Sequence, residues 1–128
     1  MKKEVHNITS CQASISAVKD ALYALNGKWK IPVIIALMEG PKRFKEIERS
    51  IEGITPRVLS KELRELELNE FIDRKVHDEI PVRITYELTP YSDSLKEIIG
   101  SLVEWGRNHR KHIMKKKKKV AKEKITFR

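Results

Sequence analysis

With 128 residues, 40% of them hydrophobic, the chain is long enough for one compact domain and a tail but not for two hydrophobic cores. It has no run of about 18 apolar residues, no apolar signal-peptide core near its start and a single cysteine, so we expect a cytoplasmic protein without a membrane span or an internal disulfide. The net charge of +9 suits a nucleic-acid partner without identifying one, because a basic run is often only a solvated end.

The spacing of apolar residues predicts four helices in the first half of the chain, over residues 14–25, 30–39, 44–51 and 56–69. The first ends at Asn26-Gly27. The second has Pro32 in its first turn and is apolar nearly all round, so we expect it to be buried. Thr55-Pro56 opens the fourth helix, since Thr55 can cap it and Pro56 suits its first position.

Two strands are predicted next, at residues 71–77 and 82–88, joined by a loop over residues 78–81. A last helix then runs from about Tyr91 to past Trp105 and carries a wide apolar face. Two helices joined by a short glycine-containing turn and followed by a hairpin are typical of a winged helix-turn-helix. We therefore predict a mainly α fold with a small β-hairpin wing.

The fourth helix has two opposite faces. Leu59, Leu63 and Leu66 form an apolar face. Three basic residues with the same spacing, Arg57, Lys61 and Arg64, each lie two residues earlier and therefore about 200° around the helix. The alternative is an ordinary amphipathic surface helix, because Glu62 and Glu65 flank the basic face. If this is a recognition helix, the residues that we expect to meet DNA are Thr55, Arg57, Val58, Ser60, Lys61 and Arg64.

The hairpin and the segments beside it supply further cations that could reach phosphates or the minor groove. The alternative is a polar outer face, because Asp73, Asp78 and Glu79 make it only partly basic. The sequence leaves open which side of the first strand faces the core, because Arg74 and the apolar Ile72 are two residues apart and so point to the same side. The candidate contacts here are Arg43, Lys45, Arg74, Lys75 and Arg83.

The positive excess lies in the tail. Residues 107–128 contain eleven basic residues and one acidic residue, whereas residues 1–106 contain 16 basic and 17 acidic residues. The run of lysines from 115 to 119 is either a solvated end or an element that adds salt-sensitive, sequence-independent affinity for phosphate.

Seven short segments add a resemblance that covers about residues 11–112: GKWK at 27–30, GPKRFKEI at 40–47, GITPRVLS at 53–60, LRELE at 63–67, PV at 81–82, YELT at 86–89 and EWG at 104–106. In this order and spacing they resemble the HxlR-type regulators, a winged-helix family related to the MarR regulators. The resemblance implies a regulator of transcription that binds double-stranded operator DNA.

The resemblance also implies a homodimer that pairs through its terminal helices and binds a near-palindromic site, with its recognition helices about 34 Å apart. The organisation is then an arm at 1–10, the winged domain with its dimerisation helices at 11–112 and a basic tail at 113–128. The residues expected at the dimer interface are Ile15, Leu22, Leu95, Ile98, Leu102 and Trp105.

Many members of this family sense oxidants or electrophiles through an N-terminal cysteine. The position expected for it, eleven residues before Gly27, is Ser16 in this chain, and Cys11 lies five residues further upstream. Cys11 is therefore either a packing residue or a redox sensor, because a helix start favours the reactive thiolate. The sequence leaves a small-molecule or redox effector unidentified.

An enzyme is not expected. The four histidines are scattered, and although His109 and His112 lie three residues apart, no cysteine or carboxylate cluster completes a metal site. We expect no catalytic residue, no metal and no cofactor. The alternative to a DNA-binding regulator is a winged-helix module that binds protein or RNA through its basic tail.

Overall fold

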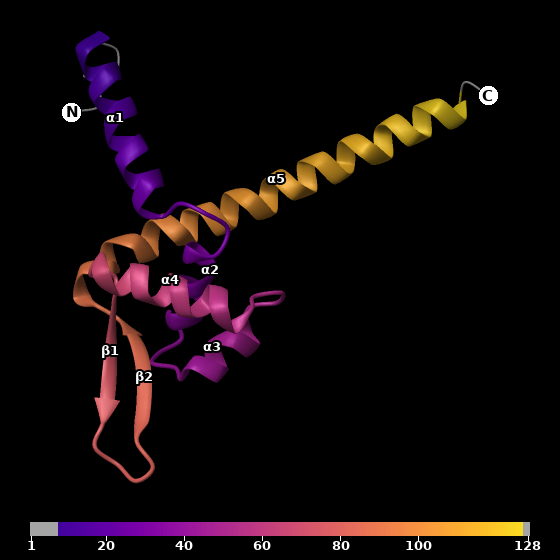
Figure 1. The fold of residues 1–128 in the computed structure, drawn as a ribbon. Coiled ribbons are helices and arrows are strands. Elements are labelled where there is room, and N and C mark those ends of the chain that lie inside the picture. Colours follow the sequence, from indigo (N-terminus) through magenta and orange to yellow (C-terminus); the bar gives the residue numbers. More distant parts are fainter. Residues whose placement is uncertain (1–7, 127–128) are drawn as a thin grey trace. The chain divides into compact units, whose positions relative to one another are not determined.

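The computed structural model describes residues 8–126, which contain five α-helices and one antiparallel hairpin (Figure 1). Together they confirm the predicted fold class, mainly helical with a two-stranded wing. The elements are α1 (Ile8–Ala24), α2 (Lys30–Leu37), α3 (Phe44–Ser50), α4 (Pro56–Leu68), β1 (Ile72–His77), β2 (Arg83–Leu88), the 3-10 turn η2 (Pro90–Ser92) and α5 (Asp93–Thr126).

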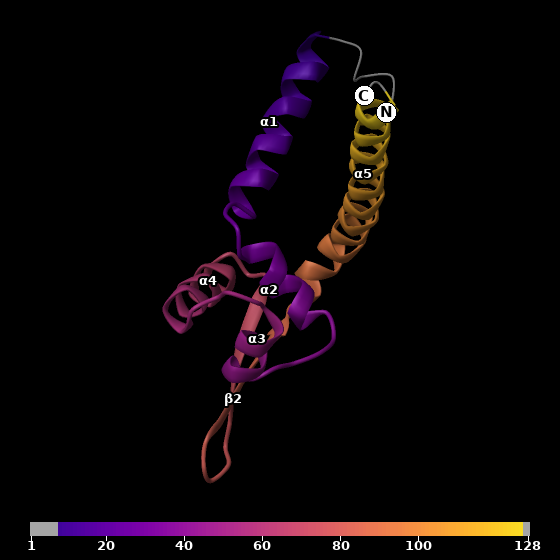
Figure 2. The same ribbon diagram turned by 90° about the vertical axis from the view of Figure 1, so that its right-hand side faces the viewer.

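The chain forms two units, the first ending at Ser92 and the second consisting of α5. In the first unit, α2, α3 and α4 gather at one end of the hairpin, and the hairpin loop projects away from them in both views (Figures 1 and 2). Apolar side chains from these helices and the base of the hairpin make its core. The fully buried ones include Val33, Ile34, Ile47, Leu59, Leu66 and Ile72.

Both ends of α4 are set by local hydrogen bonds. At its start the backbone N–H of Val58 donates to Thr55 Oγ1 at 3.2 Å, which confirms the predicted cap. At its end the N–H of Phe71 donates to the carbonyl of Leu66 at 3.0 Å, and Glu70 adopts a left-handed φ of 65°. This is a Schellman-type ending in which a glutamate occupies the position that usually holds glycine.

The hairpin pairs β1 with β2 in a register that runs from Ile72 opposite Leu88 to His77 opposite Arg83. A third segment, which the sequence did not reveal, joins its edge. Lys42 and Tyr86 exchange two backbone hydrogen bonds of 3.0 and 2.8 Å, so the chain just before α3 is fastened to β2. The start of α3 and the hairpin are thereby held together.

The first helix begins earlier than the predicted start near residue 14, because α1 already includes Ile8. Ile8 and Cys11 extend the apolar spacing of Ile15 and Val18, and no glycine or proline interrupts the segment. Residues 8–10 of the expected N-terminal arm are thus helical, and residues 1–7 lie outside the described part of the chain.

The last helix begins two residues later than the predicted start near Tyr91, and it runs past Trp105 as expected. The hydroxyl of Thr89, just before the last helix, donates to the carbonyl of Glu70 at 2.6 Å and thus closes the turn after α4. The buried hydroxyl of Ser92 likewise donates to the carbonyl of Phe71. α5 therefore starts at Asp93, and it continues to Thr126, so the lysine run is helical.

Replacing Glu70 by glycine should raise the free energy of unfolding by about 1 kcal/mol, because a left-handed backbone is strained for any residue with a Cβ atom. Urea unfolding followed by circular dichroism measures this. Glu67→Gly, inside the last turn of α4, is the matched control and should lower stability by about 1 kcal/mol. Equal destabilisation by both changes would contradict the assignment of Glu70 as the C-terminal cap.

Candidate functional site

The outward face of α4 is a strip of exposed polar side chains. Arg57, Ser60, Lys61 and Arg64 are all exposed, and Val58 is partly exposed between them. No carboxylate among the described residues lies within 4.0 Å of these three cations, although Lys61 and Arg64 do attract the Glu65 carboxylate. Their charge is therefore directed to solvent, and Arg57 also lies in the first turn of α4 at the positive end of the helix dipole, an arrangement suited to an anionic partner.

The inward face of α4 is held by leucines and by one buried cation. Leu59, Leu63 and Leu66 are at most 2% exposed, as the sequence predicted. Beside them the Lys30 ammonium, which comes from α2, lies 3.3 Å from Glu62 Oε1 and 2.5 Å from Glu65 Oε2. Since Lys30 and Glu62 are both buried, this cluster fixes how α4 is rotated about its own axis.

The cluster shifts the pKa values of two of its members. Burial lowers the pKa of Lys30, but the hydrogen bond to Glu65 and the attraction of Glu62 outweigh it and raise that pKa above its usual value. The hydrogen bond from Lys30, aided by its charge and those of Lys61 and Arg64, holds the pKa of Glu65 below its usual value despite burial. Both shifts favour the charged forms of Lys30 and Glu65.

The cations of the hairpin lie on two different faces. The structure thereby shows on which face of the first strand Arg74 lies, which the sequence left open. Arg74 pairs with Tyr86 and shares a shallow hollow with Ser60 and Arg64 of α4. Lys75, the next residue, lies on the opposite face. Arg74 thus extends the basic face of α4, whereas the other wing cations belong to a second surface.

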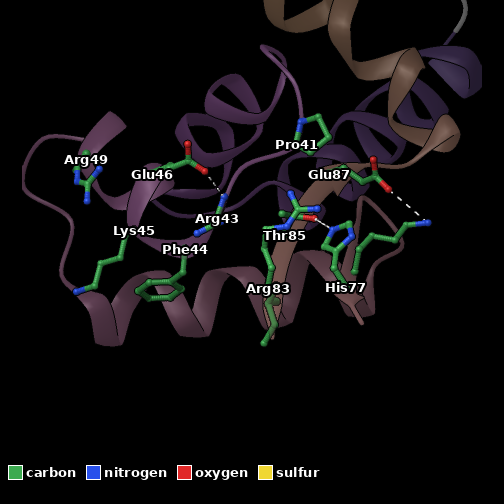
Figure 3. A pocket seen from close by; sticks show the side chains of 12 residues that line it. Pro41, Arg43, Phe44, Lys45, Glu46, Arg49, His77, Arg83, Thr85 and Glu87 are labelled. Atoms are coloured by element: carbon green, nitrogen blue, oxygen red, sulfur yellow. Dashed lines mark hydrogen bonds and ion pairs between the residues drawn. The ribbon is translucent and has the colours of Figure 1, made fainter. Parts of the chain in front are cut away.

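This second surface is a groove between α3 and the hairpin (Figure 3). It brings together the remaining predicted cations, Arg43, Lys45, Lys75 and Arg83, and adds Arg49, which sequence reasoning missed. The spacing of Arg49 four residues after Lys45 on one helix face could have indicated it.

Most cations of the groove have acidic neighbours. Lys75 lies 3.4 Å from Glu87, and Arg83 lies 3.1 Å from Glu79. Lys45 lies 3.7 Å from a carboxylate on its own helix, Glu48. The groove is therefore closer to neutral than the outward face of α4, and its cations suit adjustable contacts with phosphates better than a fixed pattern of base contacts.

The residues expected at a dimer interface lie on the two terminal helices. On α1, Ile15 is 52% and Leu22 65% exposed. On α5, Ile98, Leu102 and Trp105 are more than half exposed and Leu95 is partly exposed. Each helix taken by itself carries an apolar stripe that a single chain leaves in contact with water.

Cys11 is an exposed free thiol in the first turn of α1. Its assignment as a redox sensor stays a prediction. Among residues 8–126 no group of three histidine, cysteine or acidic side chains is placed to hold a metal ion. Over the same residues, no helix has the length and hydropathy needed to span a membrane.

Comparison with known proteins agrees with this geometry. The model of the HxlR-like helix-turn-helix family matches residues 24–114. An uncharacterised helix-turn-helix transcriptional regulator, YtcD of Bacillus subtilis (strain 168), is 37% identical over 109 residues, which cover 85% of this chain and 80% of that relative.

Solved structures point the same way. The redox regulator HypR in its reduced form superimposes with a TM-score of 0.70 at 35% identity, covering 73% of this chain and 93% of HypR. A regulator of the MarR family from Enterococcus faecalis V583 gives a TM-score of 0.68 at 38% identity, covering 75% and 87%. These relatives are transcriptional regulators and not enzymes.

Replacing Lys30 by methionine should lower the free energy of unfolding at pH 7 by about 3–5 kcal/mol, because it leaves the Glu62 carboxylate buried without its cation. Urea titration measures this. Lys30→Met/Glu62→Leu, which removes both buried charges, should regain most of the loss. If the single variant proves as stable as the wild type, the cluster does not hold α4.

The same variant should change how stability depends on pH. In the wild type the lowered pKa of Glu65 contributes stability that is present above its unfolded-state value of 4.5 and is lost as the pH falls through the folded-state value. In Lys30→Met the Glu65 carboxylate has no ammonium partner, so this contribution is removed and the variant should lose less stability than the wild type as the pH falls from 6 to below 4.5. Urea midpoints measured across this pH range test the difference.

Proposed function

We propose that this chain, which belongs to the HxlR-like helix-turn-helix family, is a sequence-specific regulator of transcription that binds a near-palindromic operator in double-stranded DNA as a homodimer. The observation that carries the proposal is the outward face of α4. There Arg57, Lys61 and Arg64 are exposed, with no carboxylate of residues 8–126 within 4.0 Å, on a helix whose opposite face is fixed in the core.

In this proposal α4 enters the major groove and its first turns meet base edges. An arginine can bind guanine through two hydrogen bonds, and Ser60 and Thr55 can bond to bases or phosphates. Val58, partly exposed between the polar residues, can contact a thymine methyl group. Rigid anchoring matters here, because base readout needs donors held at fixed positions on the duplex.

The two surfaces on either side of the hairpin then have different roles. Arg74 extends the reading face of α4, since it shares a hollow with Ser60 and Arg64. The groove cations Arg43, Lys45, Lys75 and Arg83 contact the sugar-phosphate backbone, where their acidic neighbours keep the affinity moderate. Because phosphate contacts carry no sequence information, selectivity depends on α4.

The apolar stripes of α1 and α5 support the homodimer. Most of these side chains are more than half exposed in one chain, and they are stabilised when a second copy covers them. A two-fold dimer presents its recognition helices to successive major grooves, which gives the operator its two half-sites.

Selection from a pool of random-sequence duplexes should enrich a near-palindromic motif with half-sites about 10 bp apart, centre to centre. Arg64→Glu and Lys61→Glu should each abolish the enrichment. The matched control is Lys96→Glu on α5, which makes the same charge change as Lys61→Glu at an exposed lysine that pairs with Asp93, and it should enrich the same motif.

The alternative, a module that binds RNA or protein through its basic tail, makes the opposite forecast. It expects no duplex motif in the selection and binding that the α4 variants leave unchanged. Enrichment of a motif that survives Arg64→Glu and Lys61→Glu would also overturn the assignment of α4 as the reading element.

Light scattering coupled to size exclusion should give twice the 15.0 kDa mass of one chain. Leu22→Glu on α1 and Leu102→Glu on α5 should each shift the mass toward the monomer, because a carboxylate within an apolar interface costs several kcal/mol. Ala13→Glu, on the face of α1 opposite the apolar stripe, is the control and should remain dimeric. A monomeric wild type at micromolar concentration would contradict the dimer.

A further inference from the structure

We infer that the second half of α5, residues 107–124, is an additional DNA-binding surface that contacts phosphates without reading sequence. The inference rests on the proposed function and deepens it. The surface starts inside the family match, which ends at residue 114, and extends beyond it. It is therefore largely an extension of this chain and not part of the shared winged-helix domain.

The extension is one unbroken helix. α5 contains 34 residues and runs from Asp93 to Thr126, with no glycine or proline after Gly106. Five consecutive lysines placed on a helix point in different directions, since successive residues are about 100° apart. The helix therefore determines which of the cations act together.

Five cations form one stripe along this helix. Their spacings of four, four, three and four residues keep them on one face, within about 80° of one another. These residues, called the basic stripe here, are Arg107, Lys111, Lys115, Lys118 and Lys122. Leu102, Trp105, Ile113 and Val120 lie on the opposite face, so the basic stripe points away from the apolar side of α5.

The charge of this segment is poorly balanced within the chain. Residues 107–124 contain ten basic residues and one acidic residue, Glu123. Among the described residues, no carboxylate lies within 4.0 Å of Lys111, Lys115 or Lys118. Like charges three or four residues apart repel each other on a helix, and a polyanion laid along the stripe relieves that repulsion.

The dimensions fit a duplex. The sixteen residues from Arg107 to Lys122 are separated by fifteen rises of 1.5 Å and so span about 22 Å. A DNA duplex carries about 13 phosphate charges along that length, so each cation of the stripe has several phosphates within reach. The apolar residues between 107 and 124 are Ile113, Met114, Val120 and Ala121 with no aromatic ring, whereas helices that lie on membranes usually bury tryptophan, phenylalanine or leucine.

The test compares two triple variants of the full chain that remove the same charge from different faces. Lys111→Gln/Lys115→Gln/Lys118→Gln neutralises the basic stripe. Lys116→Gln/Lys117→Gln/Lys124→Gln neutralises three lysines on the other side of the same helix. The probe is a 40-bp duplex of mixed sequence, and its dissociation constant is measured across a series of KCl concentrations. Circular dichroism and light scattering verify that both variants keep the helix content and mass of the wild type.

The stripe variant should bind about tenfold or more weakly at 0.15 M salt, and its slope of log K against log salt should be shallower by about 2.7 per chain, or 0.9 for each phosphate contact removed. The control variant should change the slope by less than 1. Equal losses of affinity in both variants would mean that all the lysines of this helix contribute irrespective of their face, and would overturn the assignment of the basic stripe. Unchanged slopes in both would overturn DNA contact by α5.

Two further results separate this inference from others. A motif enriched in the selection experiment, together with salt slopes that both triple variants leave unchanged, would overturn DNA contact by α5 and leave the proposed function intact. The absence of an enriched motif, together with a shallower slope in the stripe variant, would leave DNA contact by α5 intact and overturn the proposed function. Binding of the wild type to vesicles with 30% phosphatidylserine, lost in the stripe variant while the DNA slope stays constant, would identify a membrane partner and overturn the inference.

Discussion

The ammonium of Lys30 reaches from α2 to two glutamates of α4, while three leucines of α4 are buried in the core beside it. This combination determines the rotation of α4, and the exposed basic face depends on that rotation. Hydrophobic burial alone tolerates a small roll of a helix, whereas a buried ammonium with two carboxylate partners tolerates very little. In the sequence, Glu62 and Glu65 flank the basic face of α4 and lower its positive charge. In the structure, the same two glutamates bind Lys30 and so hold α4 in place.

A second level of order depends on the turn after α4. Glu70 takes a left-handed conformation, and the hydroxyls of Thr89 and Ser92 bond to the carbonyls of Glu70 and Phe71. The base of the hairpin is thereby fixed to the end of α4, and Lys42 fixes the other edge of β2 to the start of α3. The hairpin cations gain defined positions on two faces, one beside α4 and one beside α3.

The chain distributes its positive charge between two kinds of surface. The face of α4 is small, rigid and backed by the core, so its cations can discriminate between bases. The second half of α5 is long and highly charged, and it suits contacts that depend on salt and not on sequence. Under the two proposals the extension sets affinity and the face of α4 sets selectivity, so that either can change without the other.

The sequence by itself determined the elements whose cause is local: the leucine periodicity of α4, its Thr55 cap and the order of helices and hairpin. It also named most of the cations that line the two candidate surfaces, since residue type and spacing are visible along the chain. The facing of Arg74, the attachment of Lys42 to β2, the place of Arg49 in the groove and the buried partners of Lys30 were decided only by the tertiary structure. These depend on contacts between residues far apart in the chain, where the burial of one element fixes the orientation of another, and no local pattern encodes that.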